Sequence, residues 1–204
     1  MAIAIETPHG EARADLRPVE GPRAALVLGH GAGGGVEAPD LLAATEAARS
    51  AGLTVALVEQ PYRVAGRRSP PAANRLDAAW VAAVAGLANG ELRGLPLVVG
   101  GRSLGARVAC RTLGETGAMA VLCLAFPLQP PARQGSEPRP SRIAELDAVD
   151  IPVLIVQGAR DRFGMPPPAP DRTVVEVAGD HGLKADLDAV GNAVRDWLDG
   201  LPGL

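Results

Sequence analysis

Short runs of apolar residues alternate along this chain with longer stretches in which apolar and polar positions are mixed. The short runs predict strands at 24–28, 54–59, 97–100, 120–126, 153–157 and 173–178. The longer stretches carry apolar side chains three and four positions apart and predict helices at 39–51, 72–87, 104–113 and 187–198. Near the start, residues 3–6 and 11–17 indicate two edge strands joined by a turn at 8–10.

Strands that are apolar throughout and are separated by helices are typical of a parallel sheet covered on both faces. We therefore expect an α/β fold with a mostly parallel, doubly wound sheet and an antiparallel N-terminal hairpin, forming a single domain over residues 1–204. The segment 129–142 is rich in proline and arginine. Because proline fixes φ and lacks an N–H donor, this segment indicates an extended flap over the sheet edge, with no cap domain.

Charge and composition exclude several classes of function. The 204 residues carry a net charge of −3, which argues against a nucleic-acid partner. No apolar segment approaches the roughly 20 residues of a membrane span, and no signal peptide is recognisable, so we expect a cytoplasmic protein that does not bind membranes. Two cysteines cannot build a disulfide framework, and no metal-binding spacing of histidines occurs. We expect neither a metal nor a cofactor.

The strongest chemical signal is the pentapeptide Gly-Arg-Ser-Leu-Gly at 101–105, between the strand predicted at 97–100 and the helix predicted at 104–113. A G-x-S-x-G sequence in this context is typical of a nucleophile elbow. Small residues two positions either side of the serine allow a very sharp turn, which presents Ser103 Oγ as a nucleophile. The N–H of Leu104 points into the same space at the start of the helix.

A serine nucleophile needs a base, and the base needs a carboxylate to orient it. Of the three histidines, His181 follows the last predicted strand and so lies at the same sheet edge as Ser103. Asp161 follows the strand predicted at 153–157 at this edge and is the expected carboxylate. Asp180 is the alternative, but a residue adjacent to the histidine rarely bends back onto its ring. The sequence therefore predicts catalytic roles for Ser103, Asp161 and His181.

A glycine-rich loop after the strand predicted at 24–28 is the candidate for the rest of an oxyanion hole. Its backbone N–H groups are not shielded by side chains. We expect the N–H of Ala32 to pair with that of Leu104 and to bind the negative charge that develops on a substrate oxygen.

The same loop has a rival interpretation as a dinucleotide-binding site. Gly29, Gly31 and Gly34 fit G-x-G-x-x-G after a strand, and Glu59 ends the next strand at about the expected distance. Two strand-like segments precede the loop, however, whereas this fingerprint normally follows the first strand. The next helix also begins late, near Pro39, and a dinucleotide site would leave the serine, aspartate and histidine unexplained.

Arginines gather near the same sheet edge. Arg63, Arg67 and Arg68 follow the strand predicted at 54–59, and Arg102 lies inside the elbow. One interpretation is that Arg63, Arg67 and Arg102 bind an anionic substrate. The alternative is that Arg102 pairs with a buried carboxylate, for which Glu59 is a candidate, while the others are solvated.

With these residues in place, the chain resembles the α/β-hydrolase superfamily over almost its full length. The chain order of serine, aspartate and histidine is the order of that superfamily. More narrowly it resembles a small dienelactone-hydrolase-like group that includes a testis-expressed animal protein and a subunit of the non-specific-lethal histone acetyltransferase complex. The segments that carry this resemblance are 29–34 (GHGAGG), 61–68 (PYRVAGRR), 101–105 (GRSLG), 126–131 (FPLQPP), 158–161 (GARD) and 180–184 (DHGLK).

The resemblance implies a serine hydrolase with the same fold and triad. We expect it to act on small, short-acyl carboxylic esters or thioesters through an acyl-enzyme intermediate, with His30 and Gln129 as further substrate-contacting candidates. The sequence departs from relatives at two points: Gln129 stands where they often carry histidine, and dienelactone hydrolases use cysteine where this chain has Ser103. A non-catalytic scaffold for protein binding is the alternative, although it would not need all three triad groups.

Overall fold

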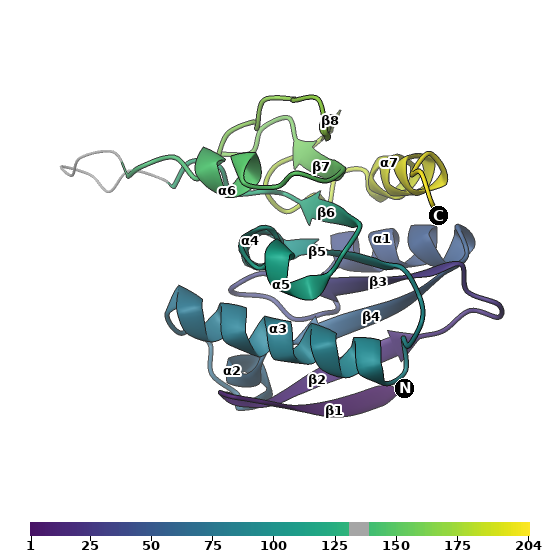
Figure 1. Cartoon of the computed structure of the whole chain (residues 1–204). Coiled ribbons are helices and arrows are strands. Elements are labelled where there is room, and N and C mark those ends of the chain that lie inside the picture. The colour runs from purple at the N-terminus through teal and green to yellow at the C-terminus, as the bar shows by residue number, and fades with distance from the viewer. Residues whose placement is uncertain (131–138) are drawn as a thin grey trace.

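One eight-stranded sheet forms the centre of the molecule (Figure 1). The computed structural model describes residues 1–130 and 139–204. The strands lie in the order β1-β2-β4-β3-β5-β6-β7-β8. Their bounds are β1 Ala2–Thr7, β2 Gly10–Arg17, β3 Ala24–Gly29, β4 Leu53–Glu59, β5 Leu97–Arg102, β6 Ala120–Leu124, β7 Val153–Gly158 and β8 Arg172–Val177.

The N-terminal hairpin is antiparallel, and the rest of the sheet is parallel, as the sequence predicts. Of the two hairpin strands only β1 is an edge strand, because β2 pairs antiparallel with β4 on its other side. The prediction of two edge strands at this end was therefore wrong. Along β2, the side chains of Ala12, Ala14 and Leu16 are buried and alternate with more exposed residues, so one face of the strand packs on the core.

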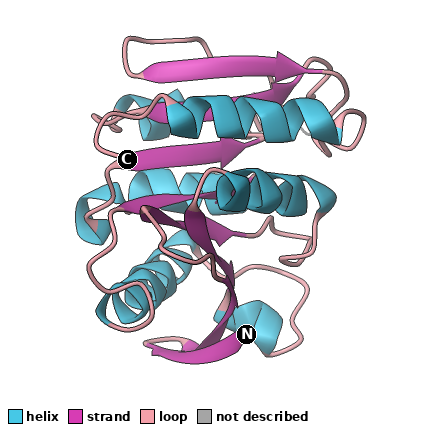
Figure 2. Ribbon diagram, turned by 90° about the vertical axis from the view of Figure 1, so that its right-hand side faces the viewer, coloured by secondary structure: helices cyan, strands magenta, loops and turns pink. Residues whose placement is uncertain are grey.

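Helices cover both faces of the twisted sheet (Figure 2). The helices α1 and α7 pack together on one face, and α3 and α4 lie on the other. The helix bounds are α1 Pro39–Ser50, α2 Pro61–Val64, α3 Ala73–Asn89, α4 Leu104–Arg111, α5 Leu113–Thr116, α6 Ile143–Asp147 and α7 Leu187–Asp199. The sequence pattern missed α2, α5 and α6, since helices of four and five residues are too short to establish a period.

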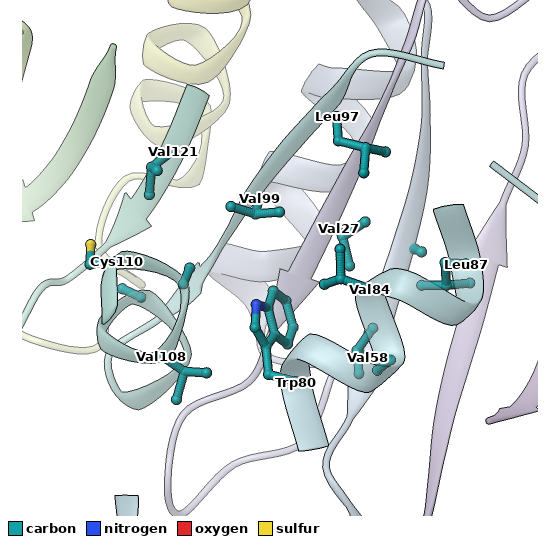
Figure 3. Packing of buried hydrophobic residues seen from close by; sticks show 14 of the residues in the cluster. Val27, Val58, Trp80, Val84, Leu87, Leu97, Val99, Val108, Cys110 and Val121 are labelled. Atoms are coloured by element: carbon teal, nitrogen blue, oxygen red, sulfur yellow. The ribbon is translucent and has the colours of Figure 1, made fainter. Parts of the chain in front are cut away.

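The core on the α3 side is built around one tryptophan (Figure 3). Trp80 of α3 is 1% exposed and lies between α4, which contributes Val108, and the strands that contribute Val27 and Val99. This packing fixes α4 against β3 and β5. Because Ser103 lies between β5 and α4, the core directly supports the turn that carries the serine.

The segment between β6 and β7 was predicted to contain an extended flap at 129–142. Residues 131–138 of that segment lie outside the described residues, so the prediction stays open there. Within the described part, the segment contains the five-residue helix α6 and no cap domain. None of the described helices is both long enough and apolar enough to span a membrane.

Candidate active site

Ser103 occupies a strained turn between β5 and α4. Its φ is +52°, a left-handed value that a non-glycine residue adopts only at a cost of about 1–3 kcal/mol. The glycines on either side are required by close backbone packing: a Cβ atom at Gly101 or at Gly105 would collide with the carbonyl oxygen of Gly29. The motif therefore needs small residues because β3, β5 and α4 converge at this point.

The structure brings Ser103, His181 and Asp161 together although they are far apart in the sequence. Ser103 Oγ lies 2.9 Å from His181 Nε2, and His181 Nδ1 lies 2.8 Å from Asp161 Oδ2. An ionised carboxylate can only accept, so Nδ1–H donates to Asp161 and the unprotonated Nε2 accepts from the serine hydroxyl. This arrangement can remove the serine proton as the oxygen attacks an electrophilic carbon, and it can stabilise the resulting imidazolium.

Two residues that the sequence analysis missed hold Asp161 in place. Gln157 Nε2 donates to Asp161 Oδ2 at 2.8 Å, and the Phe163 N–H donates to Asp161 Oδ1 at 2.9 Å. The Phe163 ring also packs on the His181 ring, with centroids 4.4 Å apart. Gln157 gave a usable signal in the sequence, because it is a polar residue at the end of an otherwise apolar run. In the structure its side chain is fully buried.

Asp180, the alternative carboxylate, takes no part in this chain of hydrogen bonds. Its side chain is exposed and its Oδ1 accepts from the N–H of Gly182, which closes a local turn. The His181 ring is thus bonded by Asp161 and not by its sequence neighbour.

The two expected oxyanion-hole donors come from separate elements, Leu104 from α4 and Ala32 from the loop after β3. Leu104 is the first residue of α4, so its N–H has no acceptor within the helix. The Ala32 N–H donates to no other group in the described part of the chain, while the Ala32 carbonyl accepts from Tyr62 Oη at 3.1 Å. This hydrogen bond fixes the loop that follows β3.

His30 has a different role from the expected substrate contact. It is buried, its Nδ1 lies 2.8 Å from the Gly31 carbonyl oxygen, and its Nε2 accepts from the Gln60 N–H at 3.1 Å. Burial lowers the pKa of His30 below its ordinary value, so the ring is neutral. With both nitrogens bonded to backbone, His30 positions the glycine-rich loop and has no nitrogen left for a substrate.

The Arg102 side chain also forms hydrogen bonds to other groups of the protein. Its Nε donates to Asp40 Oδ2 at 2.8 Å, and its Nη2 donates to the His181 carbonyl oxygen at 3.0 Å. The expected pairing of Arg102 with a buried carboxylate is thus confirmed, but the prediction of Glu59 as the partner was wrong, because the partner is Asp40. Burial raises the pKa of Asp40, and the nearby Arg102 charge offsets part of that effect.

The remaining substrate-contact candidates are spread over the surface near the site. Arg63 is partly buried on α2, whereas Arg67 and Arg68 are exposed in the loop after it. Gln129 is partly buried, and its Nε2 donates to the Arg139 carbonyl oxygen at 2.6 Å. The structure therefore does not gather these side chains with Arg102 into one anion-binding cluster. Over the described residues, no three histidine, cysteine or carboxylate side chains are grouped as metal ligands.

The sequence model of a known family matches most of the chain. The family is the alpha/beta hydrolase domain, and the match covers residues 22–186. The chain belongs to this family. The match to these hydrolases includes Ser103, Asp161 and the loop after β3, and it runs past His181. The sequence matches none of the curated proteins with which it was compared.

Solved structures share the fold of this alpha/beta hydrolase at low sequence identity. A serine hydrolase without a lid from Xanthomonas campestris is 17% identical with a TM-score of 0.72, covering 99% of this chain and 96% of that one. Est1E from Butyrivibrio proteoclasticus is 16% identical with a TM-score of 0.75, covering 97% of each chain. A dienelactone hydrolase from Anabaena variabilis is 17% identical with a TM-score of 0.74, covering 98% and 96%. These similarities confirm the expected fold.

Proposed function

We propose that the protein is a serine hydrolase that cleaves small carboxylic esters or thioesters through an acyl-enzyme intermediate on Ser103. The observation that carries this proposal is the continuous set of hydrogen bonds from Ser103 Oγ through His181 to Asp161, at 2.9 and 2.8 Å. Within the family, we also propose membership of the small dienelactone-hydrolase-like group, because of the GHGAGG and GRSLG segments. A scaffold that only binds proteins has no use for such an arrangement.

The proposed reaction has two halves. Ser103 Oγ attacks the carbonyl carbon as its proton passes to His181 Nε2, and the N–H groups of Ala32 and Leu104 bind the oxyanion. When the carbonyl re-forms, the bond to the leaving alcohol or thiol breaks, and His181 gives that group the proton. Water then attacks the acyl-enzyme with the same proton relay, which releases the acid and restores Ser103.

The proposed substrates are small, with acyl groups of about two to four carbons. Each methylene buried in an apolar tunnel contributes about 0.8 kcal/mol, so an enclosed acyl site would raise kcat/KM steeply with chain length. Ser103 is only partly buried, and the described residues between β6 and β7 form just the short helix α6. The lack of a lid in the similar Xanthomonas hydrolase fits an open site of this kind.

Labelling with a fluorophosphonate, followed by a series of p-nitrophenyl esters, tests this function. We expect stoichiometric labelling at Ser103 in the wild-type protein and none in Ser103→Ala. The value of kcat/KM should be highest for acetate to butyrate esters. A protein that is not labelled and hydrolyses no ester would contradict the proposal, and a steady rise in kcat/KM to twelve carbons would contradict the open site.

A further inference from the structure

A separate cavity is lined in part by Gln60 and Tyr62, two residues that hydrogen-bond to the proposed oxyanion loop. Its volume is about 370 Å³, within the usual range for small-molecule sites. The hairpin turn between β1 and β2 forms one wall, and α2 and the first half of α3 form the others. Pro61, Val64, Pro71 and Ala79 form the apolar part of a lining that also contains polar side chains. We name this cavity the arginine groove, after the two arginines at its edge.

Positive charge dominates the edge of the arginine groove. Arg67 and Arg75 both line it and are exposed, and neither forms an ion pair with any residue that the structure describes. The one carboxylate in the lining is Glu11, which lies 3.3 Å from Arg13 Nη2 and so is already partly balanced. A groove with both polar and apolar lining and two unpaired guanidinium groups at its edge fits a small ligand that carries one acidic group.

The groove lies apart from the proposed catalytic residues. Three strand spacings separate β2, at the groove, from β5, which leads to Ser103, or roughly 14 Å at the usual spacing. The lining of the groove contains none of the three proposed catalytic residues and neither proposed oxyanion donor, so Arg67 and Arg75 do not act on the reacting bond directly.

Two hydrogen bonds link Arg67 to the oxyanion loop. The Arg67 N–H donates to the Tyr62 carbonyl oxygen at 2.8 Å, and Tyr62 Oη donates to the Ala32 carbonyl oxygen at 3.1 Å. Gln60 lines the same wall, and its N–H donates to His30 in that loop at 3.1 Å. A ligand bound by Arg67 is therefore connected, through Tyr62, to the position of Ala32.

We propose that the arginine groove binds a small organic acid, a carboxylate or phosphate, and that its occupancy affects the oxyanion loop through Tyr62. The acid has two sources that share this chemistry: the distal end of the ester substrate itself, or a separate small molecule. The binding site stands independently of the chemistry at Ser103. The effect on the loop rests on the proposed function.

Calorimetric titration of the full chain tests the binding site, with phenylacetate and phenyl phosphate as probes and phenylacetamide as the uncharged control. We expect at least one acid to bind and the amide to bind at least tenfold more weakly. Arg67→Ala and Arg75→Ala should each raise the Kd of the acid at least tenfold. Arg68→Ala removes the same charge one position away, outside the groove lining, and should change Kd less than twofold. Equal Kd values in all three variants, or no acid binding at millimolar concentration, would overturn the site.

Hydrolysis of p-nitrophenyl acetate in the presence of the probe tests the effect on the loop. If the acid is the distal end of the substrate, the probe should raise KM competitively for an ester with a carboxylate at its far end and should leave KM for p-nitrophenyl acetate unchanged. If it is a separate ligand, the probe should change kcat, and Tyr62→Phe should abolish that change while retaining probe binding. A bound probe that alters neither KM nor kcat for either ester would overturn the link to the loop. Failure of the proposed function is distinct, since it would appear as a protein that hydrolyses no ester but still binds the probe.

Discussion

Arg102 and Asp40 form a partly buried ion pair, 2.8 Å from Nε to Oδ2, next to the proposed nucleophile in the chain. Asp40 lies in the first turn of α1, and Arg102 is the residue before Ser103. The same guanidinium donates to the carbonyl oxygen of His181 at 3.0 Å. One side chain thus ties the elbow to the beginning of α1 and to the backbone of the proposed base.

We expect Arg102→Gln to lower kcat for a short ester about 10- to 100-fold with little change in KM. Glutamine cannot bond Asp40 and the His181 carbonyl together, and a displacement of about 1 Å at a reacting group can cost this much. Steady-state kinetics with p-nitrophenyl acetate measure the effect. Arg111→Gln is the matched control, because Arg111, at the other end of α4 from Ser103, forms a similar partly buried pair with Asp77 through two hydrogen bonds. Equal losses of kcat in both variants would mean that Arg102 acts only through stability.

The strained backbone of Ser103 predicts that Ser103→Gly is more stable than Ser103→Ala. Glycine adopts positive φ freely, whereas alanine keeps the strain, and we expect a difference of about 1 kcal/mol in the free energy of unfolding. Urea denaturation followed by circular dichroism measures it. Both variants should lose ester hydrolysis by roughly 10³- to 10⁶-fold. If alanine proves as stable as glycine, the turn is not strained in solution.

The elbow could be predicted from the sequence because its constraints are local. Two glycines, a strand before them and a helix after them are all visible in a short window, and the edge positions of Asp161 and His181 follow from the strand order. The partner of Arg102 could not be predicted in this way. Glu59 and Asp40 both lie near the same edge, and the choice depends on how the loop after β3 delivers the first turn of α1 to the elbow.

The roles of His30 and Gln157 also depend on tertiary contacts that the sequence pattern does not encode. A histidine in a glycine-rich loop suggests chemistry, but the hydrogen bond that His30 accepts from the Gln60 N–H exists only once β4 is placed beside β3. Gln157 was visible as the single polar residue of a buried strand. Its donation to Asp161 depends on the turn after β7, which the pattern of apolar residues does not encode.

Asp161→Asn should reduce kcat/KM about 10⁴-fold, because an amide in place of the carboxylate favours the wrong tautomer of the histidine ring. Asp180→Asn, in the exposed neighbour, should reduce it less than fivefold, since Asp180 bonds only the local turn. Both variants remove one negative charge near His181, so long-range electrostatic effects are matched. Esterase kinetics at neutral pH compare them. A larger loss in Asp180→Asn would transfer the role of the third triad member to Asp180.

The buried His30 ring predicts an acid-dependent loss of stability. Burial lowers its pKa below the ordinary value, which the unfolded chain keeps. As the pH falls below that ordinary value, about 6.5, the unfolded state binds a proton that the folded state does not. The free energy of unfolding should then fall by up to about 1.4 kcal/mol per pH unit, and His30 should contribute no slope above that pH.

Urea unfolding between pH 5.5 and 7.5 should show this slope in the wild-type protein and in His9→Gln, a variant in the hairpin turn, but not in His30→Gln. Glutamine keeps one donor and one acceptor near the Gly31 carbonyl and the Gln60 N–H, but it does not titrate. Asp40 acts in the opposite sense, since its raised pKa makes the folded state bind a proton more readily as the pH falls. Asp40 is common to all three proteins, so the difference between them isolates His30. An unchanged slope in His30→Gln would mean that the ring is protonated in the folded protein and that its hydrogen bond from Gln60 does not exist in solution.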